Sequence, residues 1–131
     1  MKNLDCLNVL IVGVGGQGTL LASKFLGAAA ALCGKDVKVS EVHGMSQRGG
    51  SVITCVKIGD KIASPIIDEG EADVILAFEQ LEAIRWLPYL KKGGTVIING
   101  DDPILYAHKD ELGGNVLTYG IKNEKADLVA R

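Results

Sequence analysis

The chain has 131 residues, a length that suits a single domain. Apolar residues make up 47% and aromatic residues only 5%, so a core must be built mainly from Val, Ile, Leu and Ala, as in a parallel sheet covered by helices. The formal net charge is −2, basic residues form no long tract, and no apolar run reaches about 18 residues, which excludes nucleic acid and a membrane as expected partners.

The first part of the chain predicts a strand, a tight turn, a helix and a second strand. The apolar run at 7–12 predicts a buried strand, and the glycine-rich segment 13–18 predicts the turn. Residues 19–33 are rich in Leu and Ala and carry one charge, so we expect a largely buried helix that ends at Gly34. Alternation of Val with polar residues at 37–42 predicts the second strand.

The segment 43–52 reads HGMSQRGGSV and predicts a loop, because interior glycines weaken a helix and a core strand has no use for Arg48. The β-branched residues at 51–58 predict a strand. Gly59-Asp60 then predicts a two-residue hairpin turn with a return through 61–63.

In the last part, residues 72–78 predict a buried strand and 79–87 a helix that ends before Pro88. We expect this helix to place Leu81, Ile84 and Leu87 on one side.

Lys91 to Gly94 predict a turn before a strand at 95–99. Asp102-Pro103 predicts the start of a helix that runs to about 112, followed by a strand at 115–119.

The alternation of strands and helices predicts the α/β class. We expect a Rossmann-like, three-layer, mostly parallel sheet with helices on both faces and a local β-hairpin. The whole chain, 1–131, is expected to be one domain.

Three widely spaced cysteines, Cys6, Cys33 and Cys55, exclude a four-cysteine iron–sulfur cluster within this chain and show no zinc-type spacing. We expect them to be small buried apolar residues in a reducing compartment. The N-terminal residues lack the layout of a signal peptide, so a cytoplasmic location is expected. No metal site is expected.

Gly13, Gly15 and Gly18 match the spacing G-x-G-x-x-G between a predicted strand and helix, a context that suits phosphate or carboxylate binding at a helix N-terminus. Tight packing without any ligand is the alternative. Glu41 stands where a nicotinamide-dinucleotide fold has its acidic residue. The chain then enters the Arg48 loop and a hairpin instead of a second crossover helix, which argues against a dinucleotide site.

Taken together, five segments resemble the gamma-type component of 2-oxoacid:ferredoxin oxidoreductases. These are GVGGQG at 13–18, HGMSQRGGSV at 43–52, SP at 64–65, ADVILAFEQLEAIRWLPYL at 72–90 and GGTVIIN at 93–99. The GMSQRGG form, with Glu79 and Leu81-Glu82-Ala83, is most similar to the beta subunit of indolepyruvate ferredoxin oxidoreductase. Gamma components of the pyruvate and branched-chain enzymes, which share Arg-Gly-Gly, are the alternative. Such subunits usually continue with further helix, so C-terminal helical elements are expected beyond the domain seen here.

The resemblance implies a non-catalytic subunit of a complex that oxidatively decarboxylates aryl pyruvates, transfers the acyl group to coenzyme A and passes electrons to ferredoxin. It also implies thiamine diphosphate, Mg²⁺ and iron–sulfur clusters. This sequence lacks the thiamine motif and the cluster cysteines, so a large partner subunit is expected to carry them. The isolated chain is therefore expected to be inactive.

His43 and Arg48 are the only candidates for a catalytic role, and for His43 anchoring of the loop is the alternative. Arg48 can bind phosphate or carboxylate with two parallel hydrogen bonds. It could face the partner's active site or the coenzyme A channel, or it could only pair with a partner carboxylate, which would make the chain a structural assembly module. The candidate binding residues are Gly13, Gly15, Gly16, Gln17, Gly18, Ser46, Gln47, Arg48, Gly49 and Gly50.

Overall fold

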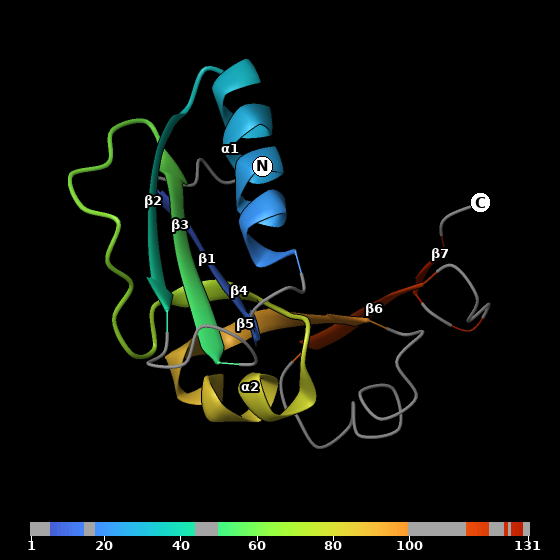
Figure 1. The fold of residues 1–131 in the computed structure, drawn as a ribbon. Coiled ribbons are helices and arrows are strands. Elements are labelled where there is room, and N and C mark those ends of the chain that lie inside the picture. Colours follow the sequence, from blue (N-terminus) through green and yellow to red (C-terminus); the bar gives the residue numbers. More distant parts are fainter. Residues whose placement is uncertain are drawn as a thin grey trace.

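The computed structural model describes residues 6–14, 18–43, 50–99, 115–120, 125 and 127–129. These residues form one sheet with strand order β2-β3-β1-β4-β5-β6-β7 (Figure 1). The strands are β1 (Cys6–Val14), β2 (Asp36–His43), β3 (Ser51–Gly59), β4 (Ala72–Ala77), β5 (Leu90–Asn99), β6 (Asn115–Gly120) and β7 (Leu128–Val129). The helices are α1 (Thr19–Leu32), α2 (Gln80–Arg85) and the 3₁₀ helix η1 (Leu87–Tyr89).

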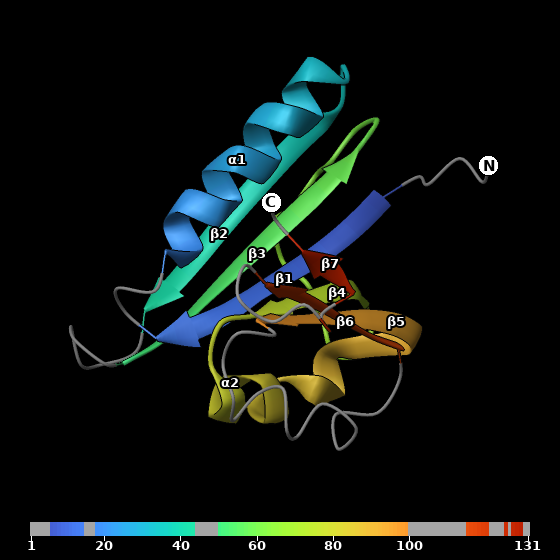
Figure 2. The same ribbon diagram turned by 90° about the vertical axis from the view of Figure 1, so that its right-hand side faces the viewer.

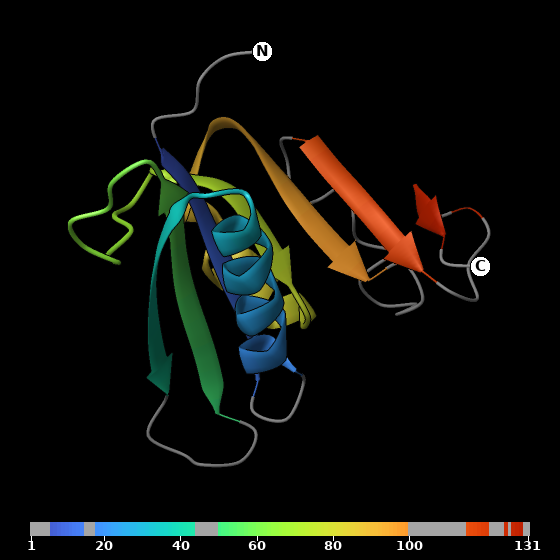
Figure 3. The same cartoon turned by 90° about the horizontal axis from the view of Figure 1, so that it is seen from above.

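The sheet is mostly parallel, which confirms the predicted α/β class. Strands β1, β4, β5, β6 and β7 pair in parallel, whereas β3 lies antiparallel between β1 and β2. Figure 2 shows α1 and α2 on opposite faces of the sheet, and Figure 3 shows how the strands fan out from β2 to β7. The prediction of three layers is therefore correct.

Alternate residues of each central strand supply the two cores, as the period of two along a strand requires. On the α2 face, Leu10, Ile75 and Val96 are fully buried. On the α1 face, Ile11 and Val56 are buried, with Leu26 of α1 packed against them.

The predicted hairpin at Gly59-Asp60 is wrong. No return strand follows in the described residues 60–71. Strand β3 instead pairs antiparallel with β1 and with β2, the strand that precedes it in the chain. The chain after β3 is attached by polar contacts: the Ile62 N–H donates to the Asp36 carboxylate at 2.9 Å, and Lys35 pairs with Asp60 at 2.7 Å. The bond from Ile62 lowers the pKa of Asp36.

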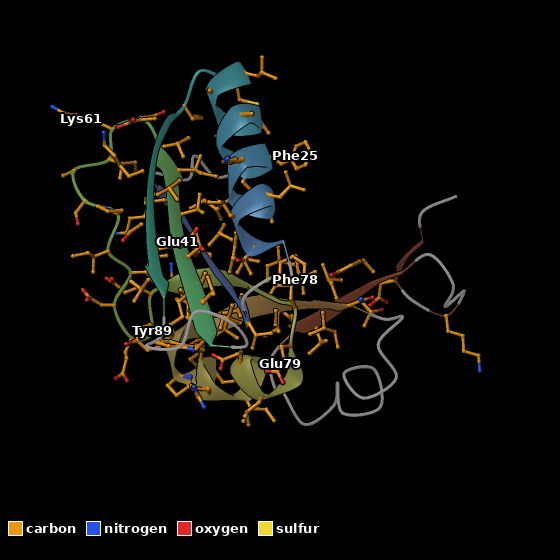
Figure 4. All side chains as sticks on the ribbon, viewed as in Figure 1. Phe25, Glu41, Lys61, Phe78, Glu79 and Tyr89 are labelled. Atoms are coloured by element: carbon orange, nitrogen blue, oxygen red, sulfur yellow. The ribbon has the colours of Figure 1, made fainter. Side chains whose placement is uncertain are left out.

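Helix α1 is less buried than predicted. Only Thr19, Ser23 and Ala30 are buried, and these small side chains allow close approach to the sheet. Gly34, at φ +73°, follows the helix end as predicted. Leu32 is 90% exposed, and the outer side of α1 also carries Phe25, which points away from β2 and β3 (Figure 4).

Helix α2 is shorter than predicted and buries a different face. Leu81 and Ile84 are exposed, whereas Glu82 and Ala83 are buried. The helix ends at Arg85, before Pro88, which lies in η1.

Lys91 to Gly94, which were expected to form a turn, belong to β5. The register of β5 against β4 shifts at this point, and Gly93 has a φ of +83°. Strand β7 was not predicted, and the helix predicted from Asp102 to about 112 lies outside the described residues. None of the described helices combines the length and apolar character that a membrane span requires.

The two leucines Leu10 and Leu32 offer a matched test of these cores. Leu10→Ala should lower the free energy of unfolding by about 2–5 kcal/mol, because the side chain is 1% exposed and its removal leaves a cavity. Leu32→Ala should change it by no more than about 0.5 kcal/mol. Urea denaturation followed by circular dichroism measures both, and equal losses would contradict the described packing of β1 and α1.

Candidate functional site

One end of the sheet gathers the segments in which the sequence predicts binding residues. Val14, the last residue of β1, pairs with Ser51, the first residue of β3, and Val52 pairs with both Gly13 and His43. Strand β4 runs parallel to β1 and ends at the same side, where the Phe78 N–H donates to the Val12 carbonyl at 2.9 Å. The chain therefore enters or leaves four neighbouring strands at this end.

Of the candidate residues, the structure describes Gly13, Gly18, Gly50 and, in its backbone, His43. Gly13 and His43 lie one strand apart on either side of Val52. The remaining candidates lie outside the described residues: Gly15, Gly16, Gln17, Ser46, Gln47, Arg48 and Gly49.

Helix α1 begins at this end of the sheet without a side-chain cap. Gly18 precedes it at φ +88°, in the left-handed region that favours glycine, and no side chain caps the first turn. No acidic residue lies in that turn. The left-handed backbone at position 18 thus favours glycine, and the first turn of α1 supplies no carboxylate of its own to the positive end of the helix dipole.

Glu41 does not stand where a dinucleotide fold needs its acidic residue. In that fold the strand that carries the acidic residue lies directly beside the first strand of the sheet. Here β3 lies between β1 and β2, so Glu41, which pairs with Thr54, is two strand spacings, about 10 Å, from β1. Figure 4 shows Glu41 on β2. The topology therefore supports the argument from sequence against a dinucleotide site.

A polar contact between α2 and β3 was not predicted from the sequence. The Glu82 carboxylate is buried, at 3% exposure, and accepts a 2.7 Å hydrogen bond from the Ser51 hydroxyl. Its own N–H donates to the carboxylate of Glu79, the N-cap of α2, at 2.8 Å (Figure 4). Two acids three residues apart at a strand–helix junction resemble a capping pair, a signal that could have drawn attention to Glu82.

The cysteines are far apart in the fold. Cys6 lies at the start of β1, Cys55 in the middle of β3, and Cys33 just after α1. Cys33 is exposed, so the expectation of a buried thiol is wrong there, whereas Cys6 and Cys55 are half-buried. Within the described part of the chain, no three His, Cys, Asp or Glu side chains gather as a metal-binding group.

The comparisons with known proteins agree with the fold. The profile of the family described as pyruvate ferredoxin/flavodoxin oxidoreductase matches residues 8–128. The indolepyruvate oxidoreductase subunit IorB of Pyrococcus horikoshii is 56% identical over 92 residues, which are 70% of this chain and 46% of that protein.

Two further relatives are more distant. The common gamma subunit of the pyruvate/ketoisovalerate oxidoreductases of Thermococcus litoralis is 35% identical over 66% of this chain and 48% of its own length. The crystal structure of a keto/oxoacid ferredoxin oxidoreductase gamma subunit from Geobacter sulfurreducens is 27% identical, with a TM-score of 0.64 over 89% of this chain and 61% of that one. This chain thus spans about half the length of the curated relatives it matches.

The cysteine environments predict an order of thiol reactivity. Burial raises the pKa of the Cys55 thiol, so little of it is thiolate near pH 8, whereas Cys33 is exposed. We expect Cys33 to react with a disulfide reagent at least about tenfold faster than Cys55 in the folded chain. Cys33→Ser should remove the fast phase, and a fast phase that persists in this variant would contradict the prediction.

Proposed function

Since this chain belongs to the pyruvate ferredoxin/flavodoxin oxidoreductase family, we propose that it is a gamma-type, non-catalytic subunit of an indolepyruvate ferredoxin oxidoreductase. The observation that carries the proposal is the difference in identity: 56% to an indolepyruvate subunit against 35% to the gamma subunit shared by pyruvate and ketoisovalerate enzymes. The reaction would be the coenzyme A-dependent oxidative decarboxylation of aryl pyruvates, with electrons passed to ferredoxin.

The residues of this chain do not fit the cofactors that such a reaction needs. A four-cysteine cluster cannot form from three cysteines. Moreover, Cys6, Cys33 and Cys55 lie on separate elements. The sequence also lacks the Gly-Asp-Gly motif for magnesium thiamine diphosphate. We therefore assign the thiamine diphosphate, Mg²⁺ and iron–sulfur clusters to a larger partner subunit and derive no chemical step on this chain.

The contribution proposed for this chain is to bind an anion at the end of the sheet where β1, β2 and β4 finish. Arg48 belongs to the seven-residue connection between His43 and Ser51, two residues that the register holds next to Val52 and Val14. A guanidinium there can bind a phosphate of coenzyme A with paired hydrogen bonds, and Gly49 and Gly50 permit close backbone approach. We propose that this loop faces the coenzyme A channel of the partner.

We further propose that residues 1–131 belong to one gamma-type domain and that the protein works in the cytoplasm. The single continuous sheet supports the first point. The three free cysteines support the second, because they suit a reducing compartment.

Substitution of Arg48 tests the proposed role in the assembled enzyme. Arg48→Lys keeps the charge but loses the paired geometry, so the KM for coenzyme A should rise about tenfold while kcat changes less and the subunits still co-purify. Arg48→Ala should raise this KM further. Unchanged turnover and KM with weakened assembly would instead identify the chain as a structural module.

Ligand binding by the isolated chain separates the proposal from a self-sufficient nucleotide-binding enzyme. Calorimetry should detect no binding of NAD(H), because Glu41 is separated from β1 by β3. Co-expression should recover a thiamine-dependent large subunit with this chain. Tight NAD(H) binding without any such partner would refute the proposed function.

A further inference from the structure

Helix α1 exposes large apolar side chains on the side away from the sheet. Leu21, Phe25 and Leu32 are 58%, 68% and 90% exposed. In contrast, Thr19 and Ser23, which carry hydroxyl groups, are buried. Within the described part of the chain, no other element packs over this outer side of α1, which faces the viewer in Figure 2. A helix that is apolar all round is normally buried on all its sides, so this side of α1 requires a partner.

The exposed apolar residues follow the spacing of a coiled coil. Leu21, Phe25, Ala28 and Leu32 are separated by four, three and four positions, and Ala28 is exposed like the other three. Residues at these intervals form one stripe along a helix, and two such stripes pack against each other in layers. We call these four residues the α1 stripe. Its spacing indicates that the partner is a second helix.

The α1 stripe is complementary to itself when two copies run antiparallel. In that arrangement Leu21 lies opposite Leu32 of the second copy, and Phe25 lies opposite Ala28 of the second copy. Each Phe25 ring therefore meets the smallest side chain of the stripe, which fills the layers evenly. A parallel pair would instead place ring against ring in one layer and Ala28 against Ala28 in another, so that one layer is overfilled and the other leaves a void.

Packing of two α1 helices along this stripe buries no charge. Lys24 is the one charged residue among the 14 of α1, and it is exposed beside the stripe, where its ammonium group stays in water. Ala22 and Ala29 flank the stripe on its other side. Small side chains there allow the two helix axes to approach closely. The charge pattern of α1 thus suits a second copy of the same helix.

We propose that the outer side of α1 is an interface with a second copy of this chain, in which the two α1 helices pack antiparallel about a twofold axis. The same patch is then used on both copies, as in other twofold dimers. A helix of 14 residues is only about 21 Å long, so the interface is smaller than the standard 1,600 Å² and we expect a dissociation constant on the order of 100 µM.

This dimer does not rest on the proposed function. At the low micromolar concentrations of a denaturation experiment the chain is monomeric, because dimer formation depends on concentration.

Two charge substitutions test the antiparallel arrangement. Leu21→Glu and Leu32→Lys each place a charge against a leucine of the second copy, so each should raise the dissociation constant at least about tenfold. Both suit the folded helix, because an acidic residue in the first turn and a basic residue in the last turn interact favourably with the helix dipole. Combined in one chain, the two introduced charges face each other between the copies, and the dissociation constant should return to within about threefold of the parent value.

Sedimentation equilibrium between about 5 and 500 µM chain measures these constants. A mixture of the Leu21→Glu and Leu32→Lys chains should associate more tightly than either chain alone, since the mixed dimer has one layer of opposite charges and keeps one layer of two leucines. Ile66→Glu is the matched control: Ile66 is 63% exposed but lies in the segment after β3, so this variant should dimerise like the parent. Circular dichroism checks that each variant is folded.

A parent chain that stays monomeric at about 500 µM would overturn the proposal. Dimers that both single substitutions weaken, but that neither the double variant nor the mixture restores, would overturn the antiparallel arrangement. If the parent is monomeric and Leu21→Glu instead abolishes co-purification with a large subunit, the outer side of α1 binds that subunit and not a second copy.

Discussion

Strand β3 runs antiparallel between β1 and β2, and its register with both strands determines where the loops of this chain can lie. Because β3 begins where β1 and β2 end, the segment after β1 and the segment between β2 and β3 start from the same end of the sheet. A parallel neighbour in the place of β3 would begin at the opposite end. The same insertion places Glu41 two strand spacings from β1 instead of one.

Three polar contacts join parts of the fold that are far apart in the sequence. The carboxylates of Asp36, Asp73 and Glu82 accept hydrogen bonds from the backbone of Ile62, the backbone of Asn8 and the hydroxyl of Ser51. Each contact joins residues at least 26 positions apart in the chain. Apolar side chains make the core, but these directional bonds join β1 to β4, β3 to α2, and the segment after β3 to β2.

The two faces of the sheet are covered to different degrees. On the α2 face Ile75, Val96 and Ile98 are fully buried, whereas on the α1 face Leu117 is 40% exposed. Helix α1 itself carries Leu21, Phe25 and Leu32 on its outer side, at spacings that place them on one helix face. On its inner side Leu26 packs against Ile11 and Val56, so the helix presents apolar groups both to the sheet and away from it.

The sequence alone determined the class of the fold, the central strands and the family, because a period of two, a Leu- and Ala-rich helix and the glycine spacing are local patterns. It misplaced the antiparallel pair, since Gly59-Asp60 suits a turn locally and only the register of β3 against β2 and β1 excludes it. The same limit applies to α2. There the apolar spacing favoured Leu81 and Ile84, yet the structure buries Glu82. Ser51, which is distant in sequence, and Trp86 both donate hydrogen bonds to its side-chain oxygen. Burial of a polar group depends on partners that only the tertiary structure supplies.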